Sequence, residues 1–408
     1  MASDLRQFLA EIDDVLIRVK RPVDLDRISA PIVDAKQPIL FEEITGYPGW
    51  KLCDLFFRDR ACQARVLRTE PGRVLPELWQ RMSLPPRRVS NGPVRQRVLK
   101  GDQLDLKSLP GFQHGEHDGG RVVIAMTLCR DPDSGHPNLA YTRMTPLTPT
   151  RATYFIGSSS HMRSALEKHE KANTPMPFAF VVGTHPAYEI MGSYTVPTHL
   201  EKFGYYHPGV TKQPVFDATA IPLREDPILR QVNTILFSDH QPLISLPHEA
   251  ILYERLRELG IRVHDVQYVP WGETLSCVIK MTPEYDGQVT DMLMHVLGQR
   301  WPNAKMVVAV DDDIDIEDPG ELYWCLATRV DPERDVFSVP NARGHPGDPS
   351  ARPLEGGPRR ASVDKWGIDA TKPPLSRASD RKRFDRCLPK HWGEVRLQNF
   401  LNGPRAPR

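Results

Sequence analysis

The chain has 408 residues, of which 40% are hydrophobic and 26% are charged, and this balance is typical of a globular protein with two or three domains. Its formal net charge of +1 gives no electrostatic basis for binding nucleic acid or an anionic membrane. No apolar run approaches the roughly 20 residues that span a bilayer, and the first residues lack an apolar signal core. We therefore expect no integral membrane segment and a cytoplasmic location.

Proline and cysteine usage narrows the class further. The 39 prolines predict many short elements joined by ordered loops, because proline breaks helices and cannot donate to a sheet ladder. None of the six cysteines forms a CxxC pair, which argues against a zinc ribbon or a thioredoxin-like motif. We expect reduced, partly buried thiols.

The first region, residues 1–105, is predicted to be an α/β domain. Leu5, Phe8, Leu9 and Ile12 follow helical spacing, and Asp4 is a candidate cap for that helix. Residues 69–101 are rich in Pro and Arg and are predicted to connect to the next domain. The other expected elements are a helix over 5–15, strands over 16–19 and 39–41, and a turn at 47–49.

The second region, residues 106–225, reads mostly as strand with one inserted helix that starts after a serine run and covers 161–168. A sheet with one helix suits a barrel-like α+β domain. The expected strands cover 122–128, 138–144, 178–182 and 215–221.

The third region, residues 226–340, is predicted to be a C-terminal α/β domain. Strands over 274–281 and 305–310 flank a helix with apolar residues at helical spacing, which is a βαβ crossover. A further helix is expected over 250–259. Residues 341–362 are dense in Gly, Pro and Arg and are predicted to be an irregular excursion, and a tail helix over 390–401 is expected to contact a partner subunit, so that 341–408 forms a fourth segment.

Two polar clusters are candidate sites with ordinary alternatives. The acidic run from Asp311 to Asp318 could bind a divalent cation, but it lacks EF-hand spacing, and a solvated or helix-capping role is the competing interpretation. His114 and His117 could ligate a metal, although HxxH is not the zinc-protease signature and a tight glycine turn explains the segment as well. Together they suggest a metal-dependent hydrolase as a minor hypothesis.

A third cluster is more informative. Asn138 and Arg143 share one predicted strand, and His161 begins the helix that follows. An amide oxygen and an imidazole can ligate a metal, and an arginine can hold a carboxylate by two parallel hydrogen bonds. Each residue taken alone is also compatible with a structural role.

At these residues the chain resembles the UbiD family of prenylated-FMN-dependent decarboxylases. The resemblance covers nearly the whole chain and is carried by segments starting at Asp4, Phe41, Leu109, His114, Val310 and Lys365. It implies a central split β-barrel, similar to flavin reductases, that binds the cofactor between an N-terminal α/β domain and a C-terminal α/β domain. It also implies a homodimer or a larger homo-oligomer, and a flavin prenyltransferase that supplies the cofactor.

The resemblance further implies a set of site residues. Asn138 and His161 match ligands of a divalent cation, typically manganese, that grips the flavin phosphate, with potassium as a further candidate ion. Because positions five apart on an ideal strand lie on opposite faces, we expect a bulge or bend between Asn138 and Arg143. The residues implied for the cofactor are Asn138, Tyr141, Thr142, Arg143, Phe155, Ile156, Gly157, Ser160, His161 and Lys365.

The chain departs from the family pattern before Glu201. The family has two glutamates in a Glu-Gly-Pro-Phe-Gly-Glu stretch; Glu201 matches the second by its distance from Gly204, and the first is absent. A stretch of several dozen residues that carries a third metal ligand is also missing, and Glu189 is a speculative replacement.

The resemblance implies non-oxidative, reversible removal of CO2 from an aromatic or α,β-unsaturated acid. Arg143 would hold the carboxylate and Glu201 would return a proton. The shortened stretch also motivates a rival, a non-catalytic cofactor-binding paralogue or companion subunit.

Overall fold

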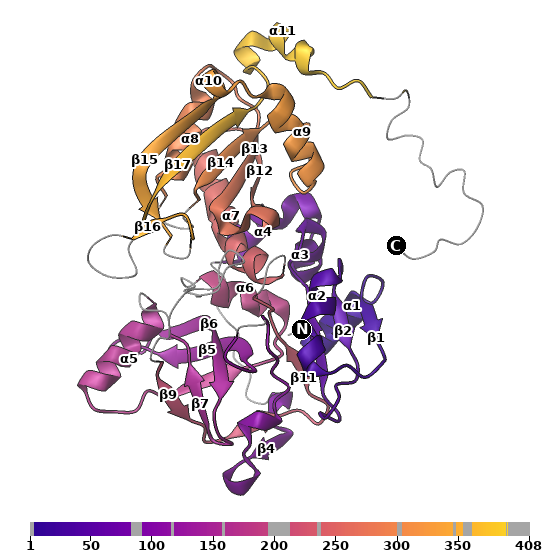
Figure 1. Cartoon of the computed structure of the whole chain (residues 1–408), viewed down its shortest axis with the longest axis vertical. Coiled ribbons are helices and arrows are strands. Elements are labelled where there is room, and N and C mark those ends of the chain that lie inside the picture. Colours follow the sequence, from indigo (N-terminus) through magenta and orange to yellow (C-terminus); the bar gives the residue numbers. More distant parts are fainter. Residues whose placement is uncertain are drawn as a thin grey trace, which may run out of the picture.

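The computed structural model describes residues 4–82, 92–115, 118–156, 160–194, 213–234, 238–299, 304–345, 348–353, 361–388 and 390. Figure 1 shows two lobes: the N-terminal and central sheets form one, the C-terminal sheet forms the other, and helix α7 (His240–Glu258) lies between them. No helix in the described ranges is both long and apolar enough to cross a membrane.

The N-terminal domain holds a four-stranded sheet in the order β1-β2-β3-β11. Its last strand comes from residues far along the chain and pairs parallel with β3. The predicted helix is present as α1, and the Asp4 carboxylate caps it by accepting from the Gln7 N–H at 2.9 Å. The elements are β1 (Ile17–Val19), β2 (Ile39–Phe41), β3 (Lys51–Asp54), β11 (Ile228–Arg230), α1 (Leu5–Glu11), α2 (Ser29–Asp34), α3 (Arg60–Leu67) and α4 (Val74–Arg81).

The central domain is a five-stranded antiparallel sheet in the order β8-β5-β6-β7-β9, with a separate β4–β10 pair. The predicted inserted helix is present as α5, and the Ser160 hydroxyl caps it by accepting from the Arg163 N–H at 3.1 Å. The elements are β4 (Arg97–Leu99), β5 (Val123–Arg130), β6 (Pro137–Pro146), β7 (Arg151–Tyr154), β8 (Phe178–Val181), β9 (Val215–Asp217), β10 (Ile221–Leu223), α5 (His161–Lys171) and α6 (Pro186–Tyr194).

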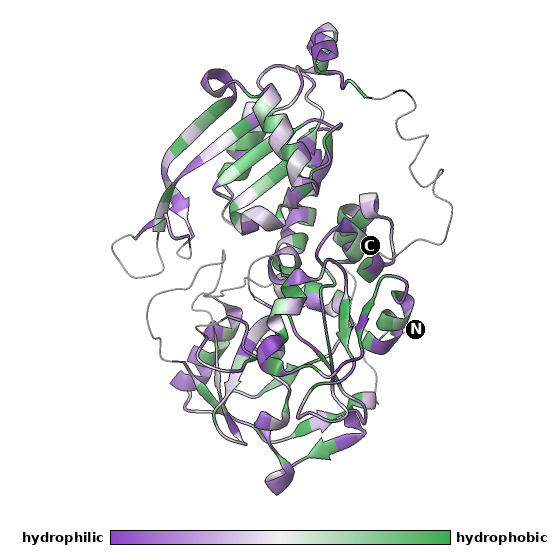
Figure 2. Ribbon diagram, turned by 45° about the vertical axis from the view of Figure 1, so that its right-hand side comes forward, coloured by the Kyte–Doolittle hydropathy of each residue, from purple (hydrophilic) through white to green (hydrophobic). Residues whose placement is uncertain are grey.

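The C-terminal domain is a sheet in the order β12-β13-β14-β17-β15, with β16 paired to β17. Strands β13, β14 and β17 are parallel, and α8 provides the predicted crossover between the first two. Strand β14 is a short apolar run and β13 is largely apolar (Figure 2), as expected where both faces of a parallel sheet are covered. The elements are β12 (Val263–Tyr268), β13 (Ser276–Met281), β14 (Met306–Val310), β15 (Val336–Gly344), β16 (Arg352–Pro353), β17 (Ala361–Ala370), α8 (Gln288–Leu297), α9 (Pro319–Arg329), α10 (Pro332–Asp335) and α11 (Ala378–Arg381).

Short 3₁₀ helices connect these elements. They are η1 (Leu25–Arg27), η2 (Pro71–Arg73), η3 (Pro93–Arg95), η4 (Gly101–Gln103), η5 (Leu106–Ser108), η6 (Pro270–Leu275), η7 (Leu375–Arg377) and η8 (Lys382–Phe384).

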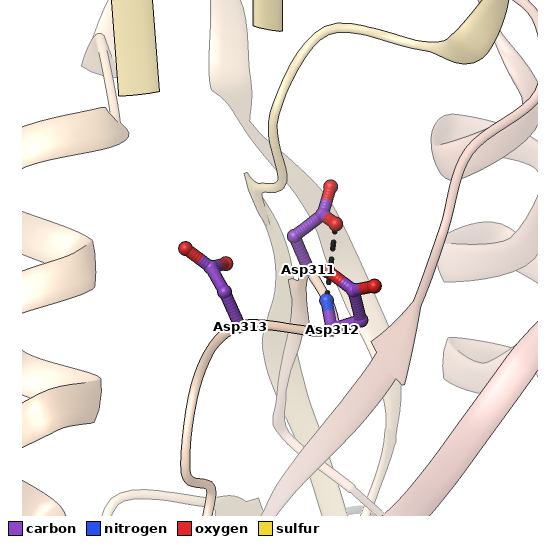
Figure 3. A group of neighbouring side chains, drawn as sticks. All are labelled: Asp311, Asp312 and Asp313. Atoms are coloured by element: carbon purple, nitrogen blue, oxygen red, sulfur yellow. Dashed lines mark hydrogen bonds between the residues drawn. The ribbon is translucent and has the colours of Figure 1, made fainter. Parts of the chain in front are cut away.

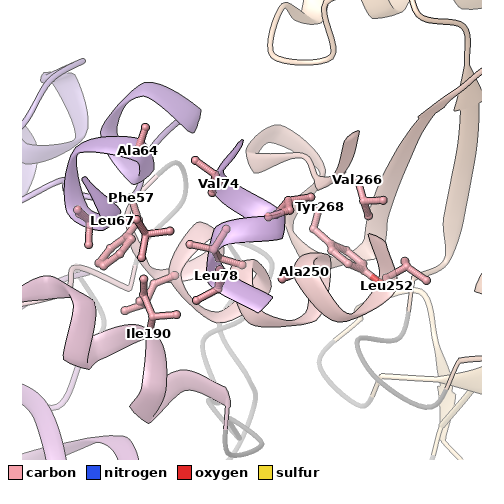
Figure 4. Packing of buried hydrophobic residues seen from close by; sticks show 14 of the residues in the cluster. Phe57, Ala64, Leu67, Val74, Leu78, Ile190, Ala250, Leu252, Val266 and Tyr268 are labelled. Carbon is pink, nitrogen blue, oxygen red and sulfur yellow. The ribbon is translucent and has the colours of Figure 1, made fainter. Parts of the chain in front are cut away.

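One hydrophobic core runs through both lobes. Figure 4 shows Phe57 and Leu78 from the N-terminal domain, Ile190 of the central domain and Val266 of the C-terminal domain packed around α7. Because side chains from all three domains contact one another in this core, α7 fixes the spatial relation between the sheets.

Several sequence predictions were wrong. The predicted connector 69–101 contains α4, whose Val74, Leu75 and Leu78 are buried. The helix predicted over 250–259 begins at His240, and the single strand over 215–221 is two strands that pair with different partners, β7 and β4. Parts of the irregular excursion belong to β15, β16 and β17, which together complete the C-terminal sheet. The predicted tail helix lies outside the described residues except for Lys390.

All six cysteines are free in the structure, and four of them are buried.

Candidate active site

Strand β6 carries the residues that the sequence singled out. Its pairing with β5 runs from Val123–Met144 to Arg130–Pro137 without a register shift, so the bulge expected between Asn138 and Arg143 is absent from this ladder. Side chains alternate strictly along such a strand, which places Asn138 and Arg143 on opposite faces of the sheet.

The face of β6 that holds Asn138 and Thr142 is turned toward a buried core. The Thr142 hydroxyl lies 2.6 Å from that of Thr127 and donates to the Tyr154 hydroxyl at 2.8 Å. The Asn138 amide nitrogen lies 3.9 Å from the Cys129 sulfur. The polar groups on this face therefore have partners inside the sheet.

The opposite face of β6 holds Tyr141 and Arg143 and packs against α6. Gly192 of α6 approaches this face so closely that a Cβ there would lie 3.2 Å from the Met126 sulfur and 3.5 Å from Leu139. Tyr141 is buried, while Arg143 is half-buried. The two faces of β6 therefore have different surroundings. The Asn138 and Thr142 face packs against hydroxyl groups, and the Tyr141 and Arg143 face packs against α6 and lies near charged side chains.

Arg143 is held by its neighbour Phe155. The guanidinium carbon lies 6.0 Å from the centre of the Phe155 ring, and the Phe155 N–H donates to the Arg143 carbonyl at 3.0 Å. Two residues that the resemblance implies for the cofactor therefore lie side by side.

His114 is buried close enough to Arg143 for the positive charge of Arg143 to affect its protonation. Burial, then the positive charge of Arg143 and then His240, lower the pKa of His114 to about 3, so its imidazole is neutral near pH 7. The Gln231 amide nitrogen donates to the Val122 carbonyl at 3.0 Å and lies 2.8 Å from Nε2 of His114. On the other side of the ring, Nδ1 accepts from the Thr234 backbone N–H at 3.1 Å and lies 2.9 Å from the Thr234 hydroxyl.

This hydrogen bonding weakens the hydrolase hypothesis. Both ring nitrogens of His114 have protein partners, and His117 lies outside the described residues. The acidic run that the hypothesis also needs belongs to the other lobe, after β14.

The remaining predicted residues occupy several positions. Ser160 and His161 form the start of α5, with His161 exposed, and Ile156 is buried after β7. Lys365 lies on β17 of the C-terminal sheet, where its buried ammonium donates to the Leu297 carbonyl at 2.8 Å. Gly157 and Glu201 lie outside the described residues.

Basic side chains pair with the acidic run after β14. Figure 3 shows the carboxylates of its first three residues. Carboxylate oxygens of Asp311, Asp312 and Asp313 lie within 4.8 Å of one another. Arg381 pairs with Asp311 at 2.7 Å, and Arg329 pairs with Asp313 at 2.7 Å. The run ends at Asp318, which caps α9 as the capping interpretation predicts, by accepting from the Gly320 N–H at 2.7 Å.

A buried charged cluster beside Tyr141 was not predicted from the sequence. Arg230 of β11 donates to Asp54 of β3, to Glu189 of α6 at 3.2 Å and to Asp239, which precedes α7, at 2.8 Å. All four side chains are at most 1% exposed, and Arg230 also stacks 4.6 Å from the Phe56 ring centre. Glu189, the speculative metal ligand, is instead an ion-pair partner.

No local sequence motif predicts this cluster, because its four residues come from four separate segments of the chain. Burial raises the pKa of Asp54 to about 6 and that of Glu189 to about 7, against the opposing charge of Arg230. Burial likewise raises the pKa of Asp239.

Comparison with known proteins places these features in context. The Rift-related domain of 3-octaprenyl-4-hydroxybenzoate carboxy-lyase (UbiD) matches residues 87–206, and the C-terminal domain of that enzyme matches residues 241–370. An anhydromevalonate phosphate decarboxylase from Methanothermobacter thermautotrophicus is 26% identical over 337 residues, which cover 70% of this chain and 77% of the relative.

Two solved structures share the whole architecture. The UbiD-class enzyme HmfF from Pelotomaculum thermopropionicum, in complex with FMN, has a TM-score of 0.86 and 27% identity over 98% of this chain and 100% of that chain. An evolved dimeric form of the same enzyme, in complex with prFMN, has a TM-score of 0.81 and 25% identity with the same coverage.

Proposed function

Because the chain belongs to the UbiD family of carboxy-lyases, we propose that it removes CO2 non-oxidatively and reversibly from an aromatic or α,β-unsaturated carboxylic acid with prenylated FMN. The observation that carries this proposal is Arg143, half-buried on β6 beside the neutral His114. Bound prenylated FMN would supply the electron sink for breaking the carbon–carbon bond.

Arg143 is the proposed holder of the substrate carboxylate. A guanidinium presents two parallel N–H donors that match a carboxylate, and stacking on Phe155 limits its orientation. His114 is neutral at working pH and adds no second positive charge there. The site therefore offers one oriented cation to an anionic substrate.

Glu201 is the proposed proton donor. Decarboxylation breaks the bond to the carboxylate carbon and needs one proton for the carbon that CO2 leaves, so R–CO2⁻ and H⁺ give R–H and CO2. A glutamic acid held near the site can deliver that proton.

The proposed cofactor contacts come from both faces of β6, from the residues after β7, from the start of α5 and from β17. Asn138 and His161 are the proposed ligands of a manganese ion, which would supply positive charge for the flavin phosphate. Within the described ranges no carboxylate is paired with either residue as a third ligand. No step of the reaction is therefore assigned to the metal. The other proposed contacts are Tyr141, Thr142, Arg143, Phe155, Ile156, Gly157, Ser160 and Lys365, with potassium as a further candidate ion.

The cellular setting is also proposed. We infer a cytoplasmic homodimer or larger homo-oligomer that receives its cofactor from a flavin prenyltransferase. The name of the archaeal relative adds a phosphorylated acid to the aromatic, heteroaromatic and acrylic acids that deserve testing.

The test is co-expression with a flavin prenyltransferase, followed by flavin absorbance and by deuterium incorporation into products from a panel of these acids in D2O. Arg143→Gln should bind flavin and lose at least about tenfold in turnover. Glu201→Gln should bind flavin and incorporate no deuterium. Arg151→Gln is the matched control, since Arg151 is exposed on the adjacent strand β7 and pairs with Asp217.

The shortened stretch before Glu201 favours one rival, a cofactor-binding companion subunit without activity. Bound flavin with no CO2 release and no exchange for any acid would support that rival. Full turnover in Glu201→Gln would remove Glu201 from the mechanism and leave the family assignment intact.

A further inference from the structure

Helix α6 has a small buried face, and that face contains a carboxyl group. The helix packs against the side of β6 that carries Arg143, while its Tyr188 and Met191 are exposed. A helix with few buried apolar side chains opens locally more readily than the core does. The buried residues of α6 are Pro186, Glu189, Ile190 and Gly192.

The carboxyl group of Glu189 belongs to a cluster whose charges do not balance. The guanidinium of Arg230 faces the carboxyl groups of Asp54, Glu189 and Asp239, and all four side chains are at most 1% exposed. With all three carboxyl groups ionised, these four groups would bury a net charge of −2, which is strongly unfavourable away from water. The packed protein therefore favours a proton on one of the three carboxyl groups.

Hydrogen bonding favours the ionised form for two of them. Asp54 accepts from backbone N–H groups at 2.7 Å and 3.1 Å, one on each oxygen, and Asp239 also accepts a backbone N–H on each oxygen. Backbone donors stabilise the charged form of a carboxyl group. The donors are Leu55 and Asn233 for Asp54, and Phe56 and Phe57 for Asp239.

Glu189 lacks this support. Its Oε2 accepts from Nε of Arg230 at 3.2 Å, the longest of the three ion pairs. Its Oε1 is buried and has no hydrogen-bond partner among the described residues. Glu189 is therefore the carboxyl group that gains most from holding the proton.

Glu189 is also the group that can leave the cluster. Asp54 belongs to β3 and Asp239 precedes the buried helix α7, so both stay beside Arg230 when α6 moves. Without Glu189, the guanidinium keeps two ionised partners that have backbone donors of their own. An ionised Glu189 is thus more stable in water than in the cluster, and its release does not break up the other three groups.

We propose that Glu189 makes α6 a pH-sensitive cover of the Arg143 face of β6: the helix stays packed while Glu189 is protonated and opens more often once Glu189 ionises. The proton exchanges directly with solvent when α6 opens, so no proton path through the protein is needed. The switch does not depend on decarboxylation. It controls how often the face that carries Arg143 is uncovered.

The pH window follows from the two pKa values of Glu189. Burial, only partly offset by the charge of Arg230, raises the pKa to about 7 in the packed helix, and the ordinary value of 4.5 applies once Glu189 meets water. Below pH 4.5 both states hold the proton and opening is rarest. Between pH 4.5 and 7 only the open state releases it, so opening becomes about tenfold more frequent per pH unit and then levels off.

Other titratable and charged groups face Glu189 from the neighbouring elements. Burial raises the pKa of Asp54 to about 6, inside the same window, but Asp54 remains buried in both states of α6. Its titration therefore does not by itself favour opening. The facing groups are Tyr141 from β6, Arg230 from β11, Cys53 and Asp54 from β3, and Asp239 before α7.

Hydrogen exchange of the full-length apoprotein tests the switch. Mass spectrometry between about pH 5 and pH 8, corrected for the intrinsic pH dependence of exchange, gives the protection of the α6 amides. In the wild type this protection should fall about tenfold per pH unit up to about pH 7 and level off above it. Amides of α8 report the stability of the whole fold. Protection of α6 that is constant with pH, or that falls only in parallel with α8, overturns the proposal.

Two variants assign the titrating group. Glu189→Gln should make the protection of α6 independent of pH, because glutamine is neutral at every pH. Glu249→Gln is the matched control: Glu249 is buried beside Arg60 on α7, burial raises its pKa to about 7, and its loss should leave the α6 slope unchanged. A slope that persists in Glu189→Gln assigns the titration to another group and overturns the switch. If Glu189→Gln does not fold, the wild-type comparison of α6 with α8 decides.

The outcomes separate this switch from the proposed function. Neither measurement uses cofactor or substrate. A holoenzyme that decarboxylates no acid would defeat the proposed function and leave the switch standing, whereas a pH-independent α6 would defeat the switch alone.

Discussion

Arg60 donates from Nη1 to Oε2 of Glu249 at 2.8 Å, and this pair ties α3 of the N-terminal domain to α7. Both side chains are at most 5% exposed. The same guanidinium donates to Asp265 at 3.0 Å and to the Val266 carbonyl at 2.6 Å. A single arginine therefore joins the first helices of the chain to the start of the C-terminal sheet.

Arg60→Met should lower the free energy of unfolding by about 3–5 kcal/mol, because it leaves Glu249 buried without its positive partner. Urea denaturation followed by circular dichroism measures the change. Arg65→Met is the control: Arg65 pairs with Asp14 on the surface, and its loss should lower the free energy of unfolding by no more than about 1 kcal/mol. Equal losses in the two variants would contradict the assignment of the Arg60 pair as a structural tie.

His114 should make the protein sensitive to acid. Its pKa is about 3 in the folded protein and 6.5 as the ordinary value, so the unfolded chain binds the extra proton first as the pH falls. Stability from this group is complete above pH 6.5 and falls by about 1.4 kcal/mol per pH unit down to pH 3.

His114→Gln should remove this slope, as measured by unfolding at a series of pH values. Phe112→Leu is the control, since Phe112 is buried 4.7 Å from the His114 ring and its truncation should lower stability equally at every pH. An unchanged acid slope in His114→Gln would refute the account.

Glu273 combines two unfavourable features in η6. Its backbone has φ 51° and ψ −152°, a region that residues other than glycine rarely adopt. Its carboxyl group is buried, and burial raises the pKa of that group to about 8. The folded protein keeps the proton up to about pH 8, whereas an unfolded glutamate releases it near 4.5. Stability should therefore fall by about 1.4 kcal/mol per unit as the pH rises through that window.

Glu273→Gln should match the wild type near pH 4 and exceed it at pH 8. Glu273→Gly should be about 1–3 kcal/mol more stable than Glu273→Gln at both pH values, because glycine relieves the backbone conformation. Thermal unfolding at the two pH values measures both effects. A Glu273→Gly variant less stable than Glu273→Gln would show that the conformation carries no strain.

Regular periodicity made the C-terminal crossover predictable. The buried side chains of α8, including Val289, Met292 and Val296, follow helical spacing, and β14 is a short apolar run. By contrast, the first half of α7 is buried on every side and contains Pro247, so no amphipathic pattern marks it. The burial of the first half of α7 is set by the elements packed around it, and its own sequence does not show it.

The candidate site likewise has a part that the sequence predicted and a part that it did not. Arg143 and Phe155 were both implied by the family resemblance, and the structure places the guanidinium of Arg143 6.0 Å from the Phe155 ring centre. The partners of Arg230 come from β3, α6 and the segment before α7, and the pairing of β11 with β3 is what brings them to one point. The sequence pattern does not predict that these residues lie close together, because their closeness arises from pairing between strands far apart in the chain.

The acidic run after β14 should not bind divalent cations in the native protein. Asp311 receives Arg381 and the Lys372 N–H, and Asp313 receives Arg329 and the Lys372 ammonium at 3.0 Å, so the carboxylates are already neutralised. A cation would have to displace these partners before it gained any ligand. Millimolar calcium or manganese should leave the Tm unchanged in the apoprotein, as measured by differential scanning fluorimetry.

A double variant, Arg329→Gln with Arg381→Gln, provides the positive control for this prediction. Removing two positive charges leaves the carboxylates within 4.8 Å of one another, with the Lys372 and Arg386 side chains as the remaining ion-pair partners of Asp313 among the described residues. The variant should be less stable than the wild type and should regain part of its Tm when calcium is added. A calcium-dependent rise in the Tm of the wild type that disappears in Asp313→Asn would show instead that the acidic run is a cation site.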